Sequence, residues 1–179
     1  MREFRDDQGR PWQVALTVAA AVRVKDNVTV DIEGEKKPFD IVDVASISTT
    51  MQVLRGQYTT LAEALYFVLV AQVNAKGLTK EQFLDGLRGD ALDAGAKALE
   101  AELIDFFPER LRRMVGLLAA KMDEASAELM EKAEKAMAEA TMDDLLAASG
   151  TPSTKPQESS DVTPESGHSE SSSPHATAA

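Results

Sequence analysis

The sequence predicts a mainly α-helical protein of the α+β kind, with a small N-terminal β-hairpin or short strands packed on a helical body, a long C-terminal helix and a disordered tail. Three observations lead to this prediction. Apolar and polar residues alternate near the N-terminus. From about residue 59 onward, apolar residues recur every three or four positions. From Ser149 onward, Ser, Pro, Thr and Glu replace nearly all large aliphatic residues, so that segment cannot form a core. We therefore expect one domain over residues 1–148 and a disordered tail over residues 149–179.

The predicted hairpin is centred on the segment Asp6–Gly9, whose composition is typical of a turn because Gly adopts positive φ. Trp12, Val14 and Leu16 alternate with other residues after it. We expect Phe4 and Trp12 to meet on one face of the hairpin. Two strands alone are barely stable, so this face must pack on the helices that follow.

The segment after the hairpin fits two patterns, because its valines suit both a short helix and strand alternation. We favour a helix that Thr17 caps and that ends near Asp26, followed by a strand over Val28–Ile32. Gly34–Pro38 is predicted to be a polar loop, and Ala45–Leu54 a helix.

The middle of the chain is expected to be helical. Thr59 or Thr60 is predicted to cap a helix that ends near Asn74, with Gly77 as a left-handed residue after it. Its apolar stripe repeats every four residues and consists of Leu61, Leu65, Leu69 and Val73.

Two further helix starts are predicted. Thr79 and Gln82 have the spacing of a capping box, and Asp90 is expected to cap the next helix. Pro108 then interrupts the helical pattern.

A long helix is predicted over residues 109–148, about 60 Å if straight. Its apolar residues follow heptad spacing at Leu111, Val115, Leu118, Met122, Ala125 and Leu129. Two arrangements fit this pattern. Either the helix extends beyond the domain and needs a partner, or it breaks near Thr141 and folds back on its own core.

Composition argues against most enzymatic chemistry. The chain has no cysteine, and its two histidines, His168 and His175, lie in the predicted tail. No catalytic, cofactor-binding or metal-binding residues are therefore predicted. The net charge of −11 argues against general nucleic-acid binding. The apolar run Val14–Val22 lacks a preceding basic segment, and no membrane segment is predicted. Protein binding is the remaining class.

The candidate partner-binding residues surround Pro108. Two adjacent phenylalanines on a helix point about 100° apart, so either neighbouring elements enclose both rings or one ring faces a partner. The arginines that follow form the densest positive cluster of the chain, and they bind either a partner or nearby acids such as Asp105 and Glu109. The candidates are Leu103, Phe106, Phe107, Arg110, Arg112 and Arg113.

The order of several motifs resembles a known family. These motifs are Arg2–Asp6, Gly9–Trp12, Thr79–Phe83, Gly89–Ala94 and Glu102–Pro108. Over roughly residues 1–125 the chain resembles tail assembly chaperone-like proteins of phages and prophages. The resemblance implies a non-enzymatic cytoplasmic protein of the bacterial host cell that binds the tape measure protein, a long hydrophobic helical protein, until tail-tube subunits replace it.

Two other functions compete with this one. The chain could be a self-associating structural or scaffold protein of a phage-like module without chaperone activity, paired through the seam from Leu111 to Leu129 as a homo-oligomer. A hydrolase or metal-dependent enzyme is disfavoured, because the predicted domain lacks His and Cys.

Overall fold

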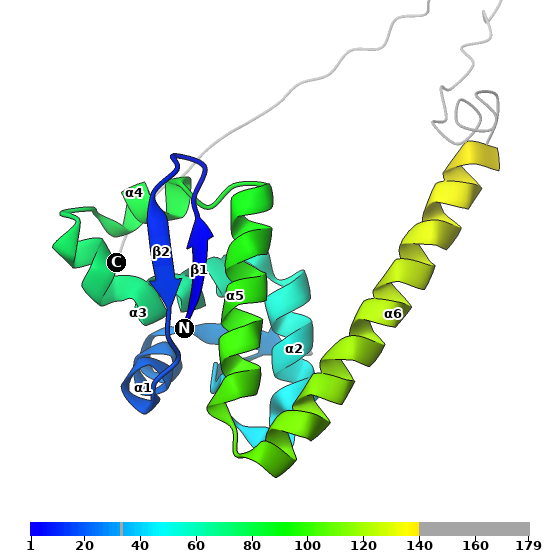
Figure 1. The fold of residues 1–179 in the computed structure, drawn as a ribbon, viewed down its shortest axis with the longest axis horizontal. Helices are drawn as coiled ribbons and strands as arrows, with labels where there is room; N and C mark the ends of the chain where they lie inside the picture. The colour runs from blue at the N-terminus through cyan, green and yellow to red at the C-terminus, as the bar shows by residue number, and fades with distance from the viewer. Residues whose placement is uncertain (33, 140–179) are drawn as a thin grey trace, which may run out of the picture. The chain divides into compact units, whose positions relative to one another are not determined.

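The computed structural model describes residues 1–32 and 34–139. Residues 1–133 form one compact unit, and the last described turns of the final helix belong to a second. The elements are β1 (Arg2–Arg5), β2 (Pro11–Val14), α1 (Val18–Asn27), β3 (Thr29–Ile32), β4 (Glu35–Pro38), a 3-10 turn (Val44–Ser46), α2 (Ile47–Gly56), α3 (Tyr58–Ala75), α4 (Lys80–Asp85), α5 (Asp90–Phe106) and α6 (Glu109–Glu139) (Figure 1). The predicted mainly helical fold with an N-terminal β element is confirmed. The predicted tail and the predicted boundary at residue 148 lie outside the described residues.

The N-terminal hairpin forms as predicted. Strands β1 and β2 are antiparallel, and their register places Phe4 opposite Trp12. Both side chains are buried, because the hairpin lies against α5 (Figure 1). Gly9 closes the turn at φ 76°, a conformation that glycine adopts without steric cost.

Helix α3 is the centre of the folded unit, since α1, α2, α4 and α5 all pack against it. Its predicted stripe of Leu61, Leu65, Leu69 and Val73 is fully buried. Trp12 reaches this core from the hairpin and meets the ring of Phe83 edge-on, with ring centroids 4.8 Å apart. The hairpin and the helices therefore share one hydrophobic core.

Three local predictions are wrong, and two of them concern β4 and the start of α3. Gly34–Pro38 is not simply a loop, because residues 35–38 form β4, which pairs with β3. All four of its side chains are exposed, so the strand has no apolar alternation to reveal it. Helix α3 begins at Tyr58, with only Gln57 between it and the end of α2, so Thr59 and Thr60 lie inside its first turn and do not cap it.

The other caps agree more closely with the sequence. Thr79 and Gln82 form the predicted capping box. Gly77 has φ 67° after the end of α3. The third wrong prediction is the cap of α5: Asp90 is the first residue of the helix, and the capping position is Gly89.

The long helix α6 contacts its own unit only at its beginning. Val115 and Ala119 are buried, and Leu118 and Met122 are half-buried. From residue 123 to residue 137 every side chain is exposed. The early part of the predicted heptad seam is therefore intramolecular core, and the later part is not.

Two glycines in helix interiors give a test of this packing. A Cβ on Gly95 of α5 would lie 2.9 Å from Leu65 Cδ1 and 3.4 Å from Phe4 Cζ, whereas one on Gly116 of α6 would meet nothing within 4 Å. Gly→Ala in a helix gains about 1 kcal/mol, and overpacking costs about 1–3 kcal/mol. We expect Gly116→Ala to stabilise the protein by about 1 kcal/mol and Gly95→Ala to destabilise it by about 1 kcal/mol. Chemical denaturation measures both, and equal signs would contradict this packing.

Candidate partner-binding surface

The two phenylalanines before Pro108 divide between core and surface. Phe107 is buried, as is Leu103 one turn earlier, so neither side chain is available to a partner in the folded protein. Phe106 is half-buried and packs edge-on against Phe107, with ring centroids 5.6 Å apart. Of these three candidates, Phe106 alone remains partly accessible.

The three candidate arginines are exposed at the start of α6. Arg112 donates a hydrogen bond of 3.1 Å to the carbonyl of Asp105, and Arg113 forms an ion pair with Glu109. Both partners are residues expected from the sequence, although the hydrogen bond of Arg112 is to the backbone carbonyl and its Nε lies 4.0 Å from Asp105 Oδ1. Arg110 has no ion-pair partner among residues 1–32 and 34–139, so its charge is available to another molecule.

Helix α6 has an inner face that begins in the core and continues beyond it. We define the inner face as Val115, Ala119, Met122, Ser126, Leu129, Met130 and Ala133, which recur at helical spacing. Leu129 and Met130 are 66% and 63% exposed, although they continue the face that buries Val115. Each large apolar side chain left in water forfeits about 1.5–3 kcal/mol of burial energy. A free face of this kind is typical of a protein-binding surface.

A groove lies where the inner face leaves the core. It has a volume of about 450 Å³, and residues of α2, α3, α5 and α6 line it. Ile104 is half-buried there, and Tyr58 lines the groove with a side chain 64% exposed. Charged side chains of Arg55, Asp93, Lys97, Glu100 and Asp123 complete the lining, so the groove is of mixed polarity. Tyrosines are common anchors in protein interfaces.

Arg55 holds α6 at the edge of this groove. Its Nε donates to Glu100 Oε2 of α5 at 3.0 Å, and its Nη1 lies 3.0 Å from Asp123 Oδ1 of α6. Its Nη2 also donates to the carbonyl of Ala119. The hydrogen bond to Glu100 raises the pKa of Arg55 further, so the charge is permanent. Nothing in the sequence pattern indicated this contact, because its partners are 45 and 68 positions away from Arg55.

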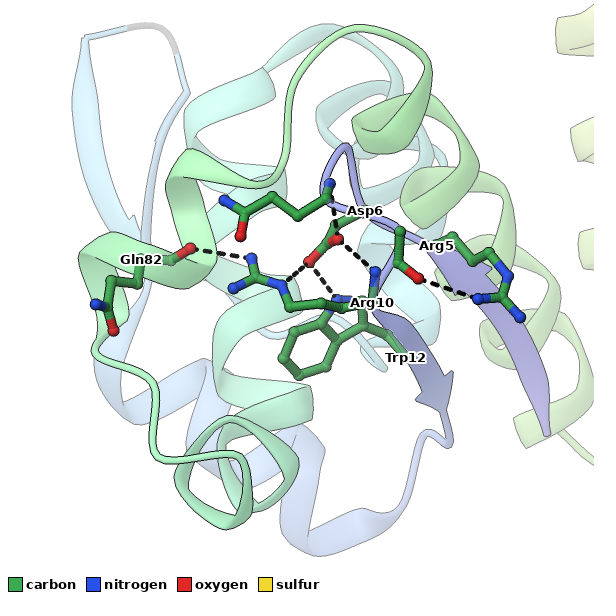
Figure 2. Close-up of polar contacts among 7 residues, drawn as sticks. Arg5, Asp6, Arg10, Trp12 and Gln82 are labelled. Atoms are coloured by element: carbon green, nitrogen blue, oxygen red, sulfur yellow. Dashed lines mark hydrogen bonds and ion pairs between the residues drawn. The ribbon is translucent and has the colours of Figure 1, made fainter.

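Among the described residues, Asp6 and Glu102 are the buried acidic side chains, and Figure 2 shows the contacts of Asp6. Its Oδ2 accepts from Arg10 Nε at 2.5 Å and from Trp12 Nε1 at 2.9 Å. Its Oδ1 accepts from the backbone N–H groups of Gln8 and Arg10. These four donors fill the accepting positions of a carboxylate, so no position is left for a substrate proton.

The electrostatics of Asp6 also argue against a role as a general base. Burial raises its pKa, but the hydrogen bonds from Trp12 and Arg10, together with the Arg10 charge, outweigh burial and hold the pKa below its ordinary value. A general base at neutral pH needs the opposite shift. Asp6 therefore stabilises the hairpin rather than performing chemistry.

The described part of the chain offers little to other functional classes. It contains no group of three or more His, Cys, Asp or Glu residues that could hold a metal ion. Within the same ranges, no helix is long and apolar enough to cross a bilayer. The strongest candidate site is the inner face of α6 with its groove.

Asp6→Asn tests the structural role of this carboxylate. The substitution removes the charge that pairs with Arg10 and should lower the free energy of unfolding at pH 7 by about 3 kcal/mol. Because the folded-state pKa is depressed, this contribution is present above the unfolded pKa of about 3.9 and is lost as pH falls through the folded pKa. Denaturation between neutral and acid pH should therefore show a smaller loss for Asp6→Asn than for wild type. The exposed neighbour is the control, and a loss of equal size in Asp7→Asn would rule this role out.

Comparison with known proteins gives no further constraint: no protein-family model, no curated protein and no solved structure matches this chain.

Proposed function

We propose that this protein is a non-enzymatic tail assembly chaperone of a phage or prophage, acting in the cytoplasm of the bacterial host cell, and that it binds the tape measure protein during tail morphogenesis. The motif order from Arg2 to Pro108 supports this family. The observation that carries the proposal is the free inner face of α6, where Leu129 and Met130 are exposed on the side that buries Val115 and Ala119.

The chemistry of this face suits a hydrophobic helical partner. Leu129 and Met130 supply large apolar contacts, while Ser126 and Ala133 are small and allow another helix to approach closely. Methionine is flexible and polarisable, so it adapts to partner surfaces of irregular shape. A chaperone that must cover many segments of a long protein needs such tolerance more than it needs a precise fit.

The groove extends the same surface onto the folded unit. Tyr58, exposed at 64%, lines the groove together with Ser126 of the inner face. A partner helix on the inner face would therefore also reach an aromatic anchor, and the two contacts would be made at once. The ring of Tyr58 adds apolar contact area there, beside the charged side chains that also line the groove.

A matched pair of variants tests this proposal. Leu129 and Leu117 are 66% and 67% exposed on the same helix, but Leu117 lies outside the inner face. Co-expression of the wild-type protein with the tape measure protein of the same genome should raise the soluble fraction of that protein. Leu129→Gln should weaken the association about tenfold or more, because it removes one large apolar contact. Leu117→Gln should leave it unchanged.

The result that contradicts the proposal is equally specific. A pull-down without association at both low and moderate salt would exclude a tape measure chaperone. A protein that self-associates but leaves the tape measure protein insoluble would instead be the scaffold alternative.

A further inference from the structure

The side of α6 that faces away from the core carries an ordered charge pattern. We define the outer face as Arg110, Arg113, Met114, Leu117, Ala120, Lys121, Glu124, Glu128 and Glu131. With about 100° between successive residues, these positions cluster roughly 160° from the inner face. In chain order, the cations Arg110, Arg113 and Lys121 come first and the anions Glu124, Glu128 and Glu131 follow.

This order is unfavourable for an isolated helix. The N-terminal end of a helix carries partial positive charge, so cations in the first turns are destabilising there. Arg110 nonetheless lies in the first turn of α6. Arg113 pairs with Glu109 within the helix, whereas within the described ranges neither Arg110 nor the three glutamates make an ion pair. The helix dipole and local pairing therefore do not account for Arg110 or for the three glutamates.

A second copy of the same helix does account for it. Consider an antiparallel pair in which the residue numbers of two facing positions sum to about 241. Arg110 of each copy then faces Glu131 of the other. Arg113 then faces Glu128, and Leu117 lies over the aliphatic part of Glu124. A two-fold axis near Ala120 and Lys121 generates every contact twice, as an isologous interface requires. Charges that flank a helix pair set its orientation in this way.

The folded unit leaves room for this pairing. Val115 and Ala119 bury the opposite side of α6, so each core lies on the side of its helix away from the partner. Met114 and Leu117, 48% and 67% exposed, supply the apolar contacts of the pair. The contact extends over residues 110–131, about 33 Å of helix.

We propose that two copies of this chain associate in antiparallel orientation through the outer faces of α6. This interface is distinct from the inner face and does not rest on the proposed chaperone function, because it forms in the isolated protein.

Sedimentation equilibrium of the full-length protein over a wide concentration range tests the proposal. We expect a reversible monomer–dimer equilibrium. Arg110→Glu with Arg113→Glu should raise the dissociation constant about tenfold or more, because four attractive contacts become repulsive. Glu128→Arg with Glu131→Arg should do the same. All four substituted positions are exposed, and circular dichroism verifies that the variants stay folded.

The decisive experiment mixes the two charge-reversed variants and measures whether they associate. Each variant alone is expected to dimerise more weakly than the wild type, whereas an equimolar mixture should form a heterodimer, because the reversed cations meet the reversed anions. Arg88→Glu changes an equally exposed arginine outside α6 and is the control. A wild-type protein that is monomeric at all concentrations, a mixture that stays monomeric, or a dimer lost in Leu129→Gln instead would overturn the proposal.

Discussion

The Asp6 carboxylate is the constraint on which the N-terminal half of the structure depends. It is fully buried, and its four donors come from the turn that it closes and from Trp12 on the next strand. Arg10, which pairs with it, also donates to the carbonyl of Gln82 in α4 (Figure 2). One side chain therefore fixes the turn, orients the central aromatic residue of the core and ties the hairpin to a helix far along the chain. A two-stranded hairpin gains its stability from such links, because it has little of its own.

The second constraint is a mismatch of length. Helix α6 has 31 residues, but its buried contacts end near Met122. An apolar face that continues beyond the core is a common form of interaction surface, and for this reason we propose the inner face as a binding surface. Arg55 strengthens this reading, because it fixes α6 to α2 and α5 at the point where the core ends.

Sequence patterns predicted the elements whose periodicity is strong. The stripe of α3, the capping box at Thr79 and the pairing of Phe4 with Trp12 all depend on contacts between near neighbours or on strict alternation. Strand β4 was not predicted, because all of its side chains are exposed and only its backbone pairing with β3 defines it as a strand. The start of α3 was not predicted, because a single residue, Gln57, separates α2 from α3 and no side chain caps α3.

The candidate surface was harder to predict for a related reason. Burial of Leu103 and Phe107 is a tertiary property, and a helical pattern identifies an apolar face without saying where the neighbouring elements stop. The Asp105 and Glu109 pairings of the arginines were predictable, because they lie within seven residues along the chain. The point at which the inner face leaves the core was not predictable, since the buried and the exposed residues of this face follow the same helical spacing.

The two proposed surfaces are compatible because they occupy different sides of one helix. The inner face is apolar and continues the core, whereas the outer face is charged and changes sign along its length. Pairing through the outer face leaves Leu129 and Met130 of both copies accessible. Apolar contact then supplies tolerance for a varied hydrophobic partner, while ordered charge supplies orientation and selects a second copy of the same chain. A single long helix can thus serve two kinds of recognition, because its two sides differ in chemistry and only one of them is needed for folding.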